Sequence, residues 1–156
     1  MKTYNVQLIA KYFISKSTPG TRQNITNLKL QKILYYAQGF YASMHEGNLL
    51  FNSDIQAWKH GPVIPDIYHT YKSYNFHEID EYVEEDFNEL LSQDKEFLDK
   101  IWDILKNFSG KQLEYLTHLE DPWKEKEPYI STRDKDKLKI EVDSIVKYFK
   151  ENHFKK

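Results

Sequence analysis

The stretch 28–44 constrains this chain more than any other feature, because its pattern is that of a helix buried on several sides. Apolar residues recur there at three- and four-residue steps. The stripe consists of Leu28, Leu30, Ile33, Leu34, Ala37, Tyr41 and Met44, and Tyr35, Tyr36 and Phe40 widen it. Such a helix is apolar around most of its circumference and sits at the centre of a fold. The sequence therefore predicts a mainly α domain built around this helix.

The ends of the central helix are also readable. Asn24 or Thr26 is suited to cap its start, because either side chain accepts a bond from an unpaired backbone N–H. Gly47 is suited to end it in a left-handed conformation. Gly39, in the interior, costs about 1 kcal/mol relative to alanine. It indicates either the close approach of another backbone or a tolerated weak spot.

Weaker patterns on either side give a compact domain of about six helices. Beyond the central one, we expect helices over 4–14, 66–74, about 97–108, 111–119 and 136–152. The helix over about 97–108 is expected to bury Phe97, Ile101, Trp102, Ile104, Leu105 and Phe108. We expect a short β element near 49–59. His60 to Pro65 is expected to form a rigid turn, with Pro65 in the first turn of the next helix. No repeat or boundary divides 1–156, so we expect a single domain.

Composition removes several classes of function. The chain of 156 residues has no cysteine, which excludes disulfides and thiolate metal sites. Its net charge of −2 gives no reason to expect nucleic acid as a partner. No apolar run approaches the ~20 residues needed to span a bilayer, and residues 1–10 lack the features of a signal peptide. We expect a cytoplasmic protein with no membrane partner.

A search for catalytic patterns finds none. The six histidines are His45, His60, His69, His77, His118 and His153, and they form no His-Glu-x-x-His pair. His60 and His69 are better explained as ordinary hydrogen-bonded side chains than as metal ligands. There is no nucleophile elbow and no glycine-rich phosphate loop. We therefore predict no enzyme, no metal and no cofactor. A hydrolase that gathers His60, His118 and a carboxylate in one pocket stays as an alternative.

Charged clusters suggest two further hypotheses. Lys29 and Lys32 on the central helix, with Lys147, Lys150, Lys155 and Lys156 in the tail, are the only basic concentrations. A DNA-binding regulator would need them on one face, but a solvated edge of the helix is the favoured interpretation. The acidic run over 78–89 is either a solvated segment or a docking surface for a basic partner.

Three segments together resemble a known family. They are 28–41 (LKLQKILYYAQGFY), 57–68 (AWKHGPVIPDIY), and 116–118 (LTH) with Pro122-Trp123. In this order and spacing they are similar to the Panacea domain, also described as the SocA-like or GepA-like phage-associated domain, over about 4–123. The resemblance implies an antitoxin of bacterial or prophage origin that neutralises a cognate toxin protein by direct contact. It also implies no enzymatic activity and no cofactor, and one relative acts as an adaptor to a host protease.

The residues of these motifs are candidates for either architecture or partner contact. They are Lys29, Gln31, Tyr35, Tyr36, Trp58, His60, Gly61, Pro62, Pro65, Tyr68, His118 and Trp123. Tyr35 and Tyr36 project about 100° apart, so we expect at most one of them to lie fully in the core. We expect Trp58 to seat the proline turn on the central helix. A motif shared by domains with many partners should hold the scaffold, and we therefore place toxin contact on exposed aromatics and the acidic run after Phe76.

Overall fold

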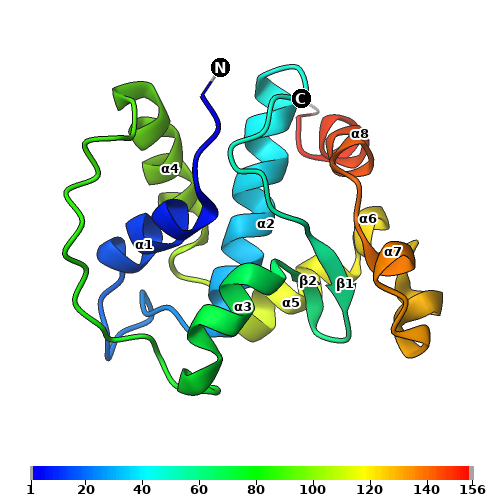
Figure 1. The fold of residues 1–156 in the computed structure, drawn as a ribbon, viewed down its shortest axis with the longest axis horizontal. Coiled ribbons are helices and arrows are strands. Elements are labelled where there is room, and N and C mark those ends of the chain that lie inside the picture. The colour runs from blue at the N-terminus through cyan, green and yellow to red at the C-terminus, as the bar shows by residue number, and fades with distance from the viewer. Residues whose placement is uncertain (1, 155–156) are drawn as a thin grey trace.

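A computed structural model describes residues 2–154, and its elements are arranged around one long helix (Figure 1). The described part has eight α-helices: α1 Val6–Lys16, α2 Asn27–Met44, α3 Pro65–Tyr71, α4 Ser92–Leu105, α5 Gly110–His118, α6 Asp121–Lys124, α7 Lys135–Leu138 and α8 Val142–Asn152. It also has two strands, β1 Gln56–Trp58 and β2 Gly61–Val63, and two 3₁₀ turns, Lys72–Tyr74 and Glu127–Thr132. The predicted mainly α class is confirmed.

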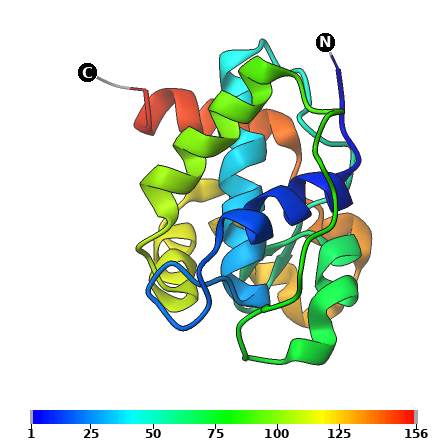
Figure 2. The same ribbon diagram turned by 90° about the vertical axis from the view of Figure 1, so that its left-hand side faces the viewer.

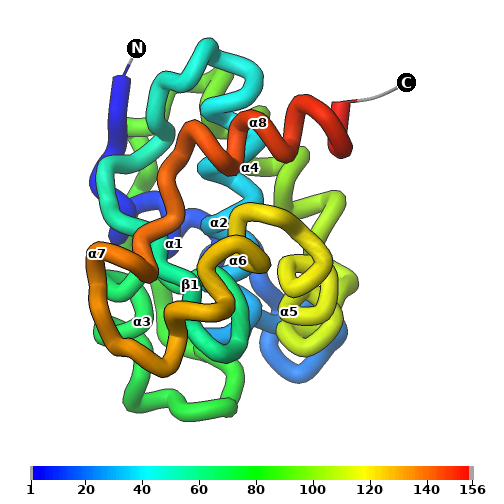
Figure 3. The backbone as a smooth tube through the Cα atoms, turned by 90° about the vertical axis from the view of Figure 1, so that its right-hand side faces the viewer, coloured from blue at the N-terminus to red at the C-terminus, as the bar shows by residue number. Residues whose placement is uncertain are grey.

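The central position of α2 is also confirmed. Helices α1 and α4 cover one side of it (Figure 2), and α5 and α8 pack against the other (Figure 3). Leu30, Ile33 and Leu34 are fully buried. The Thr26 hydroxyl caps the helix by accepting a bond from the Lys29 N–H at 3.2 Å. At the other end α2 stops at Met44, and Glu46 and Gly47 both adopt left-handed conformations.

Gly39 marks the place where α8 crosses α2. A Cβ atom at this position would lie 2.7 Å from Ile145 Cγ2 and would also clash with the Phe149 ring. The close approach is therefore made by side chains of α8 and not by its backbone. The absence of a side chain at Gly39 lets Phe149 stack into a group of rings with Tyr36 and Phe40.

The β element is a short antiparallel hairpin. Ala57 pairs with Pro62 and Trp58 with Gly61, whose φ of +108° makes the turn. The strand predicted near 49–59 is present as β1, but part of the predicted rigid turn at 60–65 is in fact β2. Pro65 begins α3, as expected.

Two helix predictions are wrong in detail. The helix expected over 136–152 is broken, because the Ile140 N–H donates to the Ile55 carbonyl and extends the backbone between α7 and α8. In α4, Ile104 is 61% exposed and Phe108 lies at the surface beyond the helix end. The buried stripe is centred near Leu98, Ile101 and Leu105, which puts Ile104 about 90° away from its centre.

The acidic run forms an extended segment that crosses α1 (Figure 2). Buried Ile79 and Leu90 anchor its two ends, and the Ile79 N–H donates to the Ile25 carbonyl at 2.7 Å. Between them, Glu85 pairs with Lys11 at 2.6 Å. The segment is thus a solvated strap held at several points. None of the helices in the described range is long and apolar enough to cross a membrane.

Candidate functional site

A pocket of about 380 Å³ opens beside the N-terminal half of α2. Its walls come from four places in the chain: α2, the β1–β2 hairpin, α3 with the turn that follows it, and α5. Four of the predicted motif residues line it together, namely Gln31, Trp58, His60 and Tyr68. It is the place where the first two motifs meet in space, and we take it as the candidate site.

One wall of the pocket is aromatic. The Trp58 ring meets the Tyr68 ring edge-on, with centroids 4.9 Å apart, and the Trp58 indole N–H donates to Gln56 Oε1. Phe76 stands beside them and is 82% exposed. Trp58 is only half-buried, and its ring contacts Tyr68 of α3. The buried tryptophan next to the hairpin is Trp123, which donates its indole N–H to the Trp58 carbonyl at 2.8 Å.

Lys32 lies in the wall of the pocket with no exposed surface. Its ammonium donates to the Pro62 carbonyl at 3.0 Å. Burial lowers the pKa of Lys32 to about 7, while the nearby Glu114 carboxylate works in the opposite direction. Gly61 makes room for this side chain, because a Cβ there would lie 2.7 Å from Lys32 Cε. The expectation that Lys32 is a solvated edge of the helix is therefore wrong.

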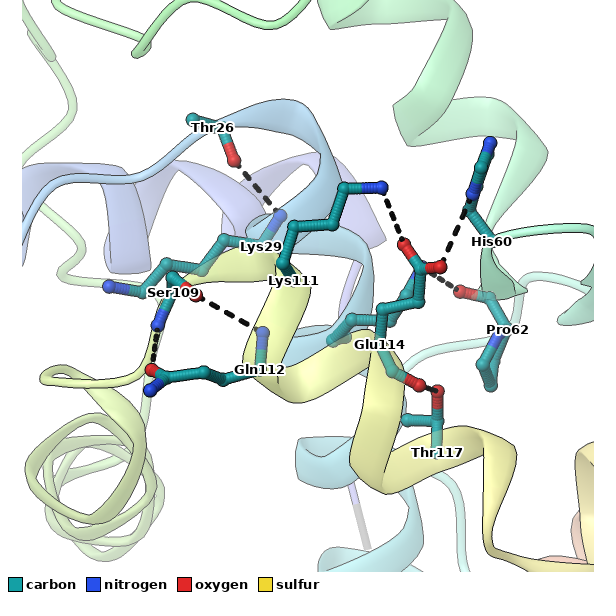
Figure 4. Close-up of polar contacts among 10 residues, drawn as sticks. Thr26, Lys29, His60, Pro62, Ser109, Lys111, Gln112, Glu114 and Thr117 are labelled. Carbon is teal, nitrogen blue, oxygen red and sulfur yellow. Dashed lines mark hydrogen bonds and ion pairs between the residues drawn. The ribbon is translucent and has the colours of Figure 1, made fainter.

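Glu114 on α5 forms ion pairs at the edge of the pocket (Figure 4). His60 Nδ1 lies 3.3 Å from one of its carboxylate oxygens, and Lys111 Nζ lies 3.3 Å from the other. Burial opposes its ionisation, but the bonds from His60 and Lys111 outweigh that effect and lower the pKa of Glu114. This carboxylate therefore stays charged at neutral pH.

Lys29 is also buried, on the far side of α2 from the pocket. Its ammonium donates to the carbonyls of Lys106 at 2.6 Å and Arg22 at 3.2 Å, and burial lowers its pKa to about 8. It ties the segment before α2 to the end of α4. A DNA-binding face would thus lack both helix lysines. Lys155 and Lys156 lie outside the described residues.

Gln31 joins the pocket to the start of α3. Its side-chain oxygen accepts a bond from the Ile64 N–H at 2.8 Å, and its amide donates to Asn27 Oδ1 at 2.8 Å. The Asn27 amide in turn donates to the Tyr68 carbonyl. A buried chain of polar groups therefore fixes β2 and α3 against α2.

Tyr35 and Tyr36 are both buried, so the expectation that only one could be is wrong. Their hydroxyls donate to the two oxygens of the buried Glu120 carboxylate, at 2.9 and 3.2 Å. His153, just after α8, lies 2.9 Å from the same carboxylate. Burial and the Glu120 charge raise the pKa of both tyrosines. The Glu120 carboxylate therefore accepts hydrogen bonds from both tyrosine hydroxyls, which allows both rings to be buried. The apolar pattern of the helix gave no sign of this partner.

His118 is separated from His60. Its ring stacks on Trp123 with centroids 3.9 Å apart, and it faces a second pocket that Glu127 also lines. Burial lowers its pKa, although Glu114 opposes that shift. The two histidines of the hydrolase alternative thus do not share a pocket. No group of three or more metal-ligating side chains occurs within 2–154.

The sequence missed several residues of the pocket. Lys59, Lys72, Phe76 and Lys111 line it, together with Lys32, whose role was assigned incorrectly. Lys32 and Lys59 lie inside the motifs. Because they are next to the candidate residues Gln31 and His60 in the chain, the sequence could have indicated that they belong to the same site. Lys72 and Lys111 come from other elements, and nothing in the linear sequence brings them to this place.

Comparison with known proteins connects this region to one family. The family described as "Antitoxin SocA-like, Panacea domain" matches residues 30–124. The protein named "Antitoxin SocA" of Caulobacter vibrioides (strain NA1000 / CB15N) is 43% identical over 49 residues, which are 31% of this chain and 26% of that protein. The aligned part thus spans about a quarter of the relative. No solved structure matches.

Proposed function

The chain belongs to the family of SocA-like antitoxins with a Panacea domain, and we propose that it is a cytoplasmic, non-catalytic antitoxin that neutralises a toxin protein by direct contact. The observation that carries this proposal is the family match over 30–124, which includes most of α2, the hairpin and α5. Because the family is named for antitoxins, a toxin protein is the kind of partner that we propose.

The buried motif residues support a division of labour within the domain. Lys29, Gln31, Lys32, Tyr35 and Tyr36 each direct a polar group to the backbone or to another buried side chain. Because they have little or no exposed surface, they serve chiefly to hold the scaffold. Recognition is therefore proposed for exposed positions outside them.

We place the toxin contact on the strap over 78–89 and on Phe76 just before it. Phe76 and Tyr82 are 82% and 86% exposed, and exposed aromatic rings are favoured at protein interfaces. Exposed carboxylates such as Glu84 and Asp80 lie near them in the chain. This combination suits a toxin with a basic surface, because complementary charge speeds association.

The strap is fixed before any partner arrives. Glu78 accepts a bond from the Gly20 N–H at 2.9 Å, Tyr74 donates its hydroxyl to Glu81, and Phe87 packs edge-on against Tyr12. A segment held in this way loses less conformational freedom on binding than a free loop does. It can therefore present Tyr82 and its carboxylates at low entropic cost.

The proposal is tested by co-expressing the chain with the product of the adjacent reading frame. We expect that product to arrest growth when expressed alone, and the chain to restore growth and co-purify with it in a fixed ratio. If the neighbouring product is harmless, or if growth returns without a complex, direct neutralisation is not the function of this chain.

The contact surface is tested separately by charge reversal. In the double variant Asp80→Lys with Glu84→Lys, we expect toxin affinity to fall at least about tenfold, mainly through slower association. Glu151→Lys on α8 is the matched control, since it is an exposed acid on the opposite side of α2 (Figures 1 and 3). Equal affinity of the two variants would move the contact away from the strap.

A further inference from the structure

Basic side chains predominate among the ionisable groups that line the pocket beside α2. Five basic side chains line it, namely Lys32, Lys59, His60, Lys72 and Lys111, whereas no carboxylate does. Glu114, just outside the lining, pairs with His60 and Lys111. Within 2–154, no carboxylate lies within 4 Å of the ammonium groups of Lys32, Lys59 or Lys72. This concentration of basic side chains occurs in a chain whose net charge is −2.

The remainder of the pocket wall is mostly apolar, with three amide side chains, Asn27, Gln31 and Asn75, among the lining residues. Trp58, Tyr68 and Phe76 form one side, and Leu28 and Val63 contribute aliphatic surface. Pockets of this kind bind organic ligands by burying an apolar body and by orienting it through a few polar groups. The volume of about 380 Å³ is in the range of small-molecule sites.

Lys32 is the second, independent sign of an anionic ligand. Its ammonium has three N–H donors, and in the described part of the chain only the Pro62 carbonyl accepts from it. A buried ammonium with one hydrogen bond is stabilised by a further anionic partner, and the Glu114 carboxylate, which raises the pKa of Lys32, lies more than 4 Å from it. Gly61 leaves the space that this side chain occupies, so the local backbone is shaped around it.

The kind of anion follows from what surrounds the pocket. Phosphate sites commonly use free backbone N–H groups at a helix start. Here Thr26 caps the start of α2, and Ser109 with Gln112 forms a capping box at the start of α5. One first-turn N–H of each helix, that of Lys29 in α2 and that of Gln112 in α5, is thus already taken by a side chain. The lining side chains offer ammonium donors beside an aromatic wall.

We propose that this pocket binds a carboxylate joined to an apolar or aromatic group, with the carboxylate near Lys32, Lys72 and Lys111 and the apolar body against Trp58 and Tyr68. This site goes beyond the proposed function, since it concerns a ligand of the domain itself. The carboxylate could come from a free organic acid or from a residue of a bound protein, and the chemistry is the same in both cases.

Calorimetric titration of the full chain with N-acetyl-phenylalanine tests the site. At pH 6, where Lys32 is protonated, we expect millimolar or tighter binding of this small acid. N-acetyl-phenylalaninamide has the same body without the charge, and we expect it to bind at least about tenfold more weakly. Equal binding of the two probes, or no binding of the acid, would overturn the proposal.

Variants locate the binding. Lys32→Met replaces the buried cation by an apolar side chain of similar length, so it should fold, and it should bring the affinity for the acid close to that for the amide. Lys72→Met, at the exposed rim, should weaken the acid severalfold and provides the same test if Lys32→Met does not fold. Lys100→Met on α4 is the matched control, being an exposed lysine outside the pocket, and should change neither affinity. Acid binding that survives both pocket variants would refute the assignment.

Competition between the probe and the bound toxin distinguishes the two possible sources of the carboxylate. If saturating N-acetyl-phenylalanine releases the toxin, the toxin supplies the group that occupies the pocket. If the complex persists while the probe still binds, the natural ligand is a free organic acid. Because the titration uses the chain alone, its failure would leave the antitoxin proposal intact. Failure of the toxin co-expression would likewise leave the proposed carboxylate site intact.

Discussion

Replacing Lys32 by methionine should stabilise the protein in acid and lose that advantage as the pH rises. In the folded chain the pKa of Lys32 is lowered from 10.5 to about 7, chiefly because the side chain is fully buried. Between these two pKa values the unfolded chain binds a proton that the folded chain does not bind. The unfolding free energy of the native sequence therefore rises with pH in this window, and the full cost of the buried charge is present only below about pH 7.

The size of the effect follows from the two pKa values. The gap between 10.5 and about 7 corresponds to about 5 kcal/mol, and about 2.5 kcal/mol of it is recovered between pH 6 and pH 9. The substitution also removes the donor to the Pro62 carbonyl, which costs about 1–3 kcal/mol at every pH. We thus expect Lys32→Met to exceed the native protein by about 2–4 kcal/mol at pH 6 and to lie within about 1 kcal/mol of it at pH 9.

Urea denaturation of both proteins at pH 6, 7, 8 and 9 measures this difference. The comparison between variants cancels the titration of Lys29, which shifts in the same direction. Lys100→Met serves as the control, since that lysine is exposed and lies outside the pocket. A stability difference that stays constant from pH 6 to pH 9 would refute the account of Lys32 as a buried, partly discharged base.

Two further substitutions test the packing around α2. Gly39→Ala should lower the unfolding free energy by about 1–2 kcal/mol, because the clash with Ile145 outweighs the gain in helix propensity; a midpoint in urea at or above the native one would contradict this. Glu120→Ala should cost about 2–5 kcal/mol, because it leaves the buried hydroxyls of Tyr35 and Tyr36 without an acceptor. Glu120→Gln keeps an acceptor oxygen and should cost less, and thermal unfolding that ranks the two variants in the other order would show that the hydroxyls have other partners.

The sequence was sufficient for α2 because a long apolar stripe with a cap at Thr26 allows few other structures. It could not show that Lys29 and Lys32 are buried. Lysine is rarely buried, and the carbonyls that receive these two side chains belong to Lys106 and Pro62, far along the chain. A periodic pattern shows which face of a helix is apolar. It does not show which distant groups accept hydrogen bonds from a polar side chain of that helix.

The same limit explains the tyrosine pair and the broken C-terminal helix. Tyr35 and Tyr36 can both be buried only because Glu120, about 85 positions away, accepts from both. Leu138 and Ile140 fit a helical count and an extended alternation equally well, and pairing with the hairpin decided between them. For the pocket, the motifs supplied Gln31, Trp58, His60 and Tyr68, whereas tertiary structure was needed to add Lys72 and Lys111.

The crossing of α8 over Gly39 also bears on how this chain is synthesised. A ribosome makes α2 early, but the helix that covers its Gly39 face is made more than a hundred residues later. Until α8 emerges, the apolar side of α2 around Tyr36 and Phe40 has no cover, and such exposed surface favours aggregation or capture by chaperones. The domain therefore depends on its C-terminal helix to complete folding, and a nascent chain stalled before α8 would be a natural target for cellular quality control.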